Sequence, residues 1–353
     1  MNRTQEVAQL RVDYQRELAD GTERFHGPKS TACPWCGSSR LRTRLRTVDL
    51  IQHKPGTFVL DQCRDCSHSF QNPRLTSEGL AFYYRDFYDG LGAANAEMLF
   101  GRKGNRKRYQ ASARALLPFG SPRRWLDVGT GHGHFPDAAR TVHPDTVFDG
   151  LDLGAGVEEG ARQGRIAEAH RGLLTELAPK LEGRYDTMSM FHYLEHTTDP
   201  RAELTAARTV LAPGGHLIIE VPDPESAMSA VLRRWWVPYF QPQHLHLMPI
   251  ANLRRELEAQ GFTVVAVARQ EPHTSFDLTG AAALVLAHAL PPADEPWHAQ
   301  PPRDFQRKAR KAMFWSAFPF LVGVYGLEQL LTPLLSRTRF SNAYRIVARG
   351  AAA

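Results

Sequence analysis

The feature that most restricts the fold of this chain is an alternation, from residue 124 onward, of short apolar runs with stretches of helical periodicity. Such an order is typical of a parallel sheet with crossover helices. Strands are predicted over residues 124–128, 147–152, 185–191, 215–221, 262–268 and 342–349, with a weaker strand over 165–170. We therefore expect an α/β protein built on a Rossmann-like, seven-stranded sheet.

Two helices between these strands are clearly marked. Asp199 offers a capping carboxylate and Pro200 suits a first helical turn, so a helix is predicted to begin there. A second helix is predicted over residues 252–260, where Gly261 closes it.

A glycine-rich loop follows the first predicted strand, with the sequence Asp127-Val-Gly129-Thr130-Gly131-His-Gly133. Glycines at alternate positions let the backbone turn sharply and approach a ligand closely. Asp127 would repel a pyrophosphate, but it can stabilise a cationic ligand. Asp152 ends the second strand 19 residues after Gly133, where a carboxylate can bind both hydroxyls of a ribose. Asp149 is a rival for that role, and an ordinary strand-to-helix turn is the alternative explanation of the glycines.

All four cysteines fall in two Cys-X-X-Cys pairs, Cys33 with Cys36 and Cys63 with Cys66, which 26 residues separate. Two such pairs supply four thiolates in a tetrahedron, which suits Zn²⁺. A shell of four protein ligands is closed, so we expect a structural zinc ribbon, with His53 and His68 surplus to it. Because no cysteine lies in the predicted sheet region, a cysteine thiolate is excluded as a nucleophile at the edge of that sheet.

Five motifs in order resemble those of the class I S-adenosylmethionine-dependent methyltransferases, in particular their ubiquinone-biosynthesis-like (type 11-12) subgroup. The motifs lie at residues 125–135, 148–152, 185–200 (with the run Leu194-Glu195-His196), 211–217 and 243–261. The cysteine pairs followed by Phe70-Gln-Asn-Pro73 are similar to the zinc ribbon of secondary-metabolite methyltransferases. The resemblance implies methyl transfer from S-adenosylmethionine to a small metabolite, a sugar or a lipid-linked acceptor at O, N or C.

The same resemblance implies a set of cofactor-binding residues. They are Asp127, Gly129, Thr130, Gly131, Gly133, Asp152, Leu153, Leu173, Met190 and Phe191.

A hydroxyl or carbon acceptor would need a base, and imidazole titrates near neutrality. The candidate bases are His192, His196, His244 and His246, among which we favour His192 or His244. The alternative for His196 and Glu195 is that they only fix the loop before the next helix. Tyr84 and Tyr88 are spaced to line a substrate pocket, although a stripe of residues facing the core is an equal alternative.

The C-terminal part holds a basic stretch at residues 303–311 before the mostly apolar segment 312–335. Such a sequence can lie on a membrane. A buried helix that covers the substrate pocket explains the same sequence, and we favour that interpretation.

We divide the chain into an N-terminal helix and zinc ribbon (1–75), a bridging helical lid (76–120), a methyltransferase core (121–270), a helical cap (271–340) and a last strand with a tail (341–353). The N-terminus has no apolar region of a signal peptide, so the expected setting is the cytoplasm.

The charge distribution leaves RNA open as a second class of methyl acceptor. The net charge is +6, and segment 23–108 alone carries 15 Lys or Arg against 8 Asp or Glu. The first rival function is therefore an RNA methyltransferase that grips phosphates through the ribbon and residues 102–108. The second rival is a non-catalytic scaffold of the same fold. A nicotinamide dehydrogenase is disfavoured by the two acidic residues around the glycine loop.

Overall fold

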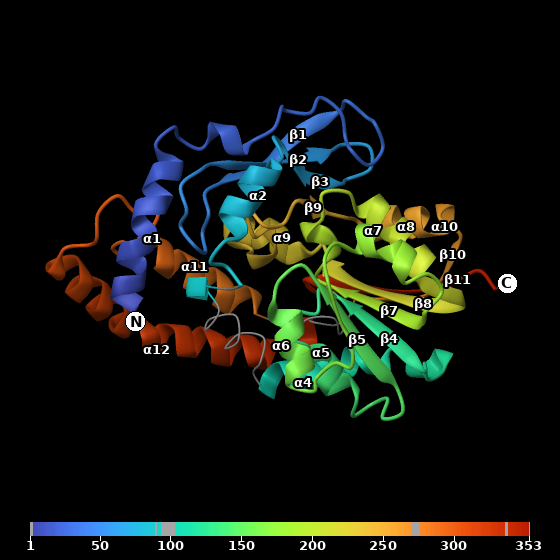
Figure 1. The fold of residues 1–353 in the computed structure, drawn as a ribbon. Coiled ribbons are helices and arrows are strands. Elements are labelled where there is room, and N and C mark those ends of the chain that lie inside the picture. The colour runs from blue at the N-terminus through green and yellow to red at the C-terminus, as the bar shows by residue number, and fades with distance from the viewer. Residues whose placement is uncertain (1–2, 89, 93–102, 270–275, 336–337, 353) are drawn as a thin grey trace.

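The computed structural model describes residues 3–88, 90–92, 103–269, 276–335 and 338–352. Its larger sheet has seven strands in the order β10-β11-β8-β7-β4-β5-β6 (Figure 1). Strand β11 is antiparallel to both of its neighbours, whereas β8, β7, β4, β5 and β6 run parallel. The strands are β4 (Arg124–Val128), β5 (Val147–Asp152), β6 (Ala169–Arg171), β7 (Tyr185–Phe191), β8 (Leu211–Pro222), β10 (Phe262–Ala268) and β11 (Ala343–Gly350).

The predicted seven-stranded α/β sheet is confirmed, with two differences in strand length. Strand β8 begins at Leu211 rather than at 215, so it runs through the Pro-Gly-Gly sequence that was expected to precede it. Strand β6 holds only Ala169–Arg171, because residues 165–168 still make hydrogen bonds with the end of the preceding helix and with single positions of β5.

Helices cover both faces of this sheet. One face packs on α4 (Lys103–Arg114) and α5 (His134–Ala139) through a cluster that includes Trp125 and Phe148. The other face packs on α7 (Leu174–Leu177), α8 (Pro200–Val210) and α10 (Ile250–Ala259). A further short helix, α6 (Gly156–Arg162), follows β5. The Asp199 carboxylate accepts hydrogen bonds from the first backbone N–H groups of α8, as expected of its cap.

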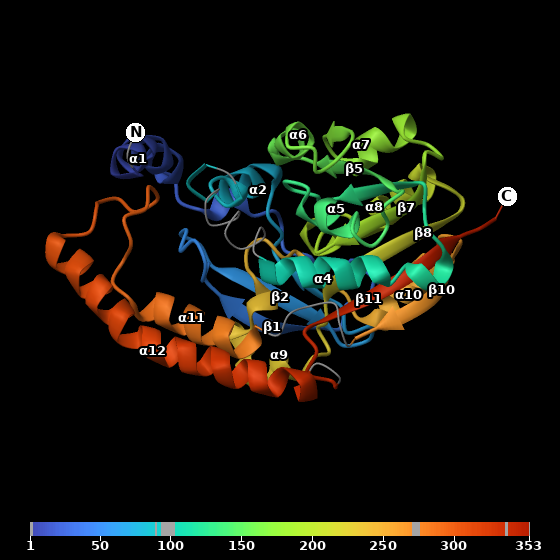
Figure 2. The ribbon, with the colours of Figure 1, turned by 90° about the horizontal axis from the view of Figure 1, so that it is seen from below.

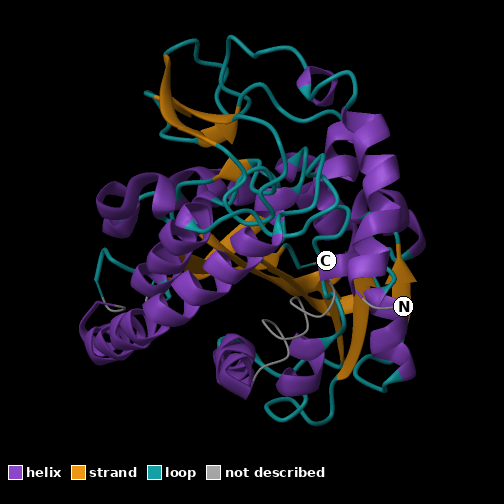
Figure 3. Ribbon diagram, turned by 90° about the vertical axis from the view of Figure 1, so that its left-hand side faces the viewer, coloured by secondary structure: helices purple, strands orange, loops and turns teal. Residues whose placement is uncertain are grey.

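The N-terminal part forms a separate four-stranded antiparallel sheet, ordered β1-β2-β3-β9. It consists of β1 (Leu41–Thr47), β2 (Phe58–Cys63), β3 (Ser69–Gln71) and β9 (His246–Leu247). We call residues 33–71, which hold the cysteine pairs, the ribbon. Figure 3 shows this sheet above the larger one, with loops between them. The fourth strand, β9, comes from the segment between β8 and α10. The sequence pattern did not indicate that this segment joins the sheet of the ribbon.

Three other helices surround the ribbon. They are α1 (Arg3–Leu18), α2 (Ser77–Tyr84) and α9 (Ala227–Leu232). Helix α1 is held by ion pairs to a distant loop, Arg3 with Glu295 at 3.0 Å and Arg11 with Asp294 at 2.6 Å. The first helix of the chain therefore packs on its C-terminal third as well as on the ribbon.

The expectation that segment 312–335 is buried over the substrate pocket is wrong. Helix α11 (Asp277–Ala289) packs along the long helix α12 (Asp304–Leu335), and α12 forms the outermost layer of the molecule (Figure 2). Only 6% of the most apolar 18-residue stretch of α12 is buried. A single stripe of α12 suffices to pack against α11, so the rest of its apolar surface faces outward.

Candidate functional site

The glycine loop after β4 adopts the backbone that its sequence requires. Gly129, Gly131 and Gly133 all have positive φ angles, of 74°, 53° and 74°, a region that favours glycine. A Cβ atom on Gly129 would lie 2.9 Å from the Tyr193 ring, whereas a Cβ atom on Gly131 would meet nothing within 4 Å. The middle of the loop is therefore an open backbone cradle at the carboxyl end of β4.

Asp152, at the end of β5, lies against this cradle. Its Oδ2 accepts a hydrogen bond from the Gly131 N–H at 2.8 Å, and its Oδ1 accepts one from the Gly154 N–H at 2.8 Å. Burial raises the pKa of this carboxyl, against the effect of those N–H groups. The rival Asp149 is committed elsewhere, because its Oδ2 accepts from Arg124 at 2.7 Å and from Tyr185 at 2.9 Å.

Asp127 is a second buried carboxyl beside the loop. It accepts a 2.6 Å hydrogen bond from the Ser189 hydroxyl of β7, and burial raises its pKa to about 7. Asp127 and Asp152 are thus two buried carboxyl groups beside one loop, each with a raised pKa. A cationic ligand bound there would stabilise their ionised forms.

His192 follows β7 at the same edge of the sheet, with a positive φ of 53°. Its Nδ1 lies 3.1 Å from Oε1 of the fully buried Glu195. Burial acts to raise the pKa of Glu195, but the hydrogen bond with His192 and the charges of His192, His196 and His244 together outweigh it, so the pKa is lowered. Since an ionised carboxylate only accepts, Nδ1 of His192 carries the proton and Nε2 is its acceptor atom.

His196 and His244 join this pair from two loops. Their rings lie edge to face with centroids 4.6 Å apart. His244 Nδ1 donates to the Pro238 carbonyl at 2.8 Å, and burial lowers the pKa of its ring to about 3. That value makes His244 a weak proton acceptor at neutral pH.

Glu195, His196 and His244 also form a possible metal-ligand group. Their donor atoms all lie within 4.8 Å of one another. Glu195 Oε2 is buried and has no hydrogen-bond partner among the described residues. The group can therefore hold a metal ion as well as a proton.

The structure does not bring the predicted base His246 into this cluster. His246 lies in β9, where its Nδ1 is 3.1 Å from Nε2 of His68, and burial lowers its pKa to about 4. The surplus His68 is fully buried and stacks on Trp35. These contacts favour a packing role for both rings.

Tyr84 reaches the histidine cluster, with its hydroxyl 2.8 Å from His196 Nδ1. Tyr88 does not lie on the same helix, because α2 ends at Tyr84 and Asp86 has a φ of 59°. The two tyrosine rings nevertheless remain close, with centroids 6.3 Å apart.

The remaining residues predicted to bind a cofactor differ in exposure. Leu153 and Leu173 are 66% and 40% exposed beside the ends of β5 and β6. The Met190 side chain is fully buried in the core beside the larger sheet. Thr130 is buried, and the half-buried Phe191 packs on Phe135 with ring centroids 4.6 Å apart.

The four cysteines converge as their spacing predicted. The Sγ atoms of Cys33 and Cys66 lie 3.6 Å apart, and those of Cys36 and Cys63 lie 3.5 Å apart. All four Sγ atoms are within 4.8 Å of one another, and none of the histidines that the structure describes belongs to the cluster. The cluster has the ligands and the closeness of a four-thiolate metal site.

Sequence reasoning missed the contacts that tie the ribbon to the histidine loop. Gln71 Nε2 donates to Gln241 Oε1 at 2.9 Å, and the Gln71 N–H donates to the Leu245 carbonyl at 2.9 Å. The Leu245 N–H in turn donates to the Glu195 carbonyl at 2.7 Å. These partners are more than 40 residues apart in sequence, so no local pattern announces them.

Comparison with known proteins covers the middle of the chain. Residues 102–267 match the family model described as a methyltransferase domain. The chain is 29% identical over 139 residues to "Ubiquinone biosynthesis O-methyltransferase" of Marinobacter nauticus, a match of 35% of this chain and 55% of that protein. The protein of the same name from Acinetobacter baylyi is 29% identical over 129 residues, or 34% and 53% of the two chains. The chain thus spans about half the length of the curated relatives it matches.

Among solved structures, the chain is similar to magnesium protoporphyrin IX methyltransferase from Synechocystis PCC 6803 with bound SAH. That likeness covers 77% of this chain and 100% of the other, at 14% identity and a TM-score of 0.46.

The matched segment 102–267 contains strands β4 to β8 and nearly all of β10, together with the glycine loop, Asp152 and the histidine cluster. Its family model and the seven-stranded order of the sheet agree with the motifs of the sequence. Residues 102–267 therefore form a methyltransferase domain, whose motifs and strand order resemble those of the class I S-adenosylmethionine-dependent methyltransferases.

Proposed function

We propose that the chain is an enzyme that transfers a methyl group from S-adenosylmethionine to a hydroxyl of a small-molecule acceptor. One observation carries this proposal: the Gly131–Asp152 cradle and the His192–Glu195 pair lie at the carboxyl ends of neighbouring parallel strands. Ligands of open α/β sheets bind at that edge. A donor held by the cradle and an acceptor beside the histidine would meet there.

The residues of the cradle fit this donor. Asp152 has lone pairs left for two ribose hydroxyls, and the open face of Gly131 permits close approach of a ligand. The buried carboxyl of Asp127 suits a ligand with positive charge. When bound, S-adenosylmethionine supplies a methyl group on a sulfonium, whose positive charge is lost in the transfer.

His192 is the residue that we propose as the base. Its Nε2 accepts the proton of the acceptor hydroxyl, while Glu195 fixes the ring through Nδ1 and stabilises the charged imidazolium. Tyr84 and His196 position the acceptor from the other side of the site. His244 keeps a neutral ring at neutral pH and serves as part of the wall.

The choice of a hydroxyl and of a small molecule rests on two supports. The curated relatives are named O-methyltransferases, and an oriented histidine is useful for a hydroxyl but dispensable for an amine. The RNA alternative has less support, because Arg106 of the predicted phosphate-binding stretch is paired with Asp137 at 2.7 Å. Arg102 of that stretch lies outside the described residues. We place the reaction in the cytoplasm, where S-adenosylmethionine is made.

We further propose that Cys33, Cys36, Cys63 and Cys66 hold a structural Zn²⁺. The spacing of the four sulfurs suits a tetrahedral ion, and backbone N–H groups of Trp35 and Asp65 point at the sulfurs of Cys33 and Cys63 from 3.4 Å. Four thiolates leave no open position for a reacting molecule, so the ion would order the ribbon.

The Asp152→Ala variant is expected to bind S-adenosylmethionine more weakly by roughly 1–3 kcal/mol, the scale for loss of a buried hydrogen-bonding group. Isothermal titration calorimetry measures this change, and Glu176→Ala, an exposed acidic position on α7, is the matched control. Equal affinity of the Asp152 variant and the wild type would remove the ribose assignment. If the wild type binds no donor, the non-catalytic scaffold becomes the better explanation.

Donor affinity is expected to depend on pH through Asp127. Because burial raises the pKa of this carboxyl to about 7, it is protonated below that pH and ionised above it. The ionised form attracts a cation, so affinity should fall as pH drops through 7, by up to about tenfold per unit. Calorimetry one pH unit on either side tests this, and Asp127→Asn should abolish the dependence. An unchanged pH profile in that variant would contradict the assignment.

His192→Ala is expected to lower kcat by about 10²–10⁴, the usual loss for a general base, with the donor Kd unchanged. His244→Ala should have a smaller effect because its ring is a weak proton acceptor. Transfer of labelled methyl from the donor to a metabolite extract, followed by mass spectrometry, gives the rate and the acceptor atom. A fully active His192 variant, or product on nitrogen, carbon or RNA, would refute the hydroxyl mechanism.

Cys63→Ser is expected to lose the bound zinc, lower the Tm and lower kcat, while the donor Kd changes little. The reason is that β3, next to the cysteine cluster, pairs with β9 beside the histidine loop. Elemental analysis and thermal unfolding measure the first two effects, and Ser39→Ala, an exposed neighbour, is the control. If wild-type protein without zinc unfolds at the same Tm as wild-type protein with zinc, the ion is not structural.

A further inference from the structure

The outward face of α12 is apolar over most of its length. Trp315, Phe320 and Leu330 are 57%, 66% and 77% exposed. The exposed large apolar residues of this helix from Met313 onward are Met313, Phe314, Trp315, Phe318, Phe320, Val322, Tyr325, Leu327, Leu330 and Leu334. A patch of this extent on a water-soluble surface marks a site of interaction.

The inner stripe of α12 is already occupied by α11. Glu328, the one charged residue in segment 312–335, is 2% exposed. Its carboxylate accepts hydrogen bonds from the backbone N–H groups of Leu278 and Thr279 at 2.8 and 2.9 Å, at the start of α11. The single acidic side chain of residues 312–335 is thus hydrogen-bonded inside the protein, and the outward face of that segment carries no charged residue.

A basic cluster precedes this apolar face. Residues 303–311 contain Arg303, Arg307, Lys308, Arg310 and Lys311 against the single acid Asp304. Lys308 and Lys311 are exposed and form no ion pair with any residue that the structure describes. The helix therefore begins with cations and continues with exposed aromatic and aliphatic side chains.

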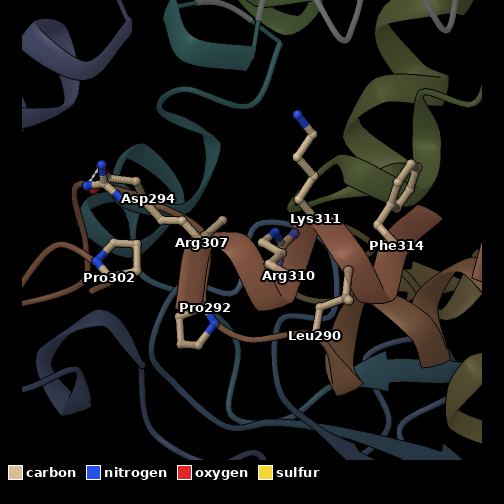
Figure 4. A pocket seen from close by; sticks show the side chains of 9 residues that line it. Leu290, Pro292, Asp294, Pro302, Arg307, Arg310, Lys311 and Phe314 are labelled. Atoms are coloured by element: carbon tan, nitrogen blue, oxygen red, sulfur yellow. Dashed lines mark hydrogen bonds and ion pairs between the residues drawn. The ribbon is translucent and has the colours of Figure 1, made fainter. Parts of the chain in front are cut away.

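Three of these cations, Arg307, Arg310 and Lys311, line a cavity of about 310 Å³ between the loop after α11 and the first turns of α12 (Figure 4). Arg307 is paired there with Asp294 at 3.0 Å, and Arg310 donates to the Pro291 carbonyl at 2.6 Å. Lys311 extends away from the helix, and Phe314 adjoins it one turn further on. Cationic groups next to an apolar ring match the boundary between a phosphate headgroup and an acyl chain.

We propose that α12 seats the protein on the surface of an anionic lipid bilayer. The cationic start would lie at the phosphate level, while the outward face of segment 312–335 enters the acyl boundary. The helix lies in the surface and does not cross it, because α11 holds its other face. The N-terminus of α11 is in turn anchored to the body through Asp277, which accepts from Trp236 at 2.8 Å and Asn342 at 2.9 Å.

Vesicle sedimentation of the full-length protein tests the proposal. Binding is expected to vesicles of phosphatidylcholine with phosphatidylglycerol, and to be much weaker to phosphatidylcholine alone. The double variant Lys308→Gln, Lys311→Gln should lower partitioning on the anionic vesicles about 25-fold, or about fivefold per charge. Lys180→Gln, an exposed lysine away from α12, is the control and should bind like the wild type.

A second variant tests the apolar face. Trp315→Ser with Phe320→Ser should lower partitioning more than tenfold, because both rings lose their burial in the acyl boundary. Leu117→Ser, at an exposed apolar position on another surface, should not. All four side chains changed on α12 are exposed, so their replacement should leave the fold intact. An unchanged thermal unfolding curve checks this. These assays need no methyl transfer, so they stand apart from the proposed reaction.

Three results would overturn the proposal. The first is wild-type protein that stays in solution with anionic vesicles. The second is equal binding of the wild type and both α12 variants. The third is a stable dimer, seen by sedimentation equilibrium without lipid and lost in the Trp315, Phe320 variant, which would show that a second copy covers the face.

Discussion

The pairing of β3 with β9 is the constraint on which the arrangement of the histidine cluster at the carboxyl edge of the larger sheet depends. Strand β9 is two residues long, yet it places the backbone of Leu245 between the ribbon and Glu195. Gln71 donates to that backbone from one side, and the Leu245 N–H donates onward to Glu195. The ribbon and the loop that holds the histidine cluster are thereby one continuous hydrogen-bonded unit.

This connection explains why histidines so close in sequence have different surroundings. Strand β9 begins at His246, whose ring lies against His68 of the ribbon, whereas His244 precedes the strand and lies with His196. Burial depresses the pKa of both His244 and His246. His192 instead has a carboxylate partner, which is what an imidazole needs in order to stabilise a proton that it accepts.

The sequence was sufficient for the features that depend on local chemistry. Strands β4, β5 and β7 have the predicted bounds, because buried parallel strands appear as short apolar runs between turns. The antiparallel edge strand β10 also has its predicted bounds, and it alternates exposed with less exposed residues. The positions of the glycines and of Asp152 followed from the same short-range rules. Strand β9 did not, because a two-residue strand has no periodicity and its partner is far away in the chain. The exposure of α12 was missed for a related reason: an apolar helix has the same composition whether protein or lipid covers it.

The place of β11 in the sheet affects how a nascent chain can fold. This strand lies between β8 and β10, yet it follows α11 and α12 in sequence. On the ribosome, β10 emerges without a partner and stays an open edge while the whole hairpin of α11 and α12 is translated. The apolar helix therefore reaches water before the sheet closes, which makes this interval the time of greatest demand for a chaperone or a lipid surface.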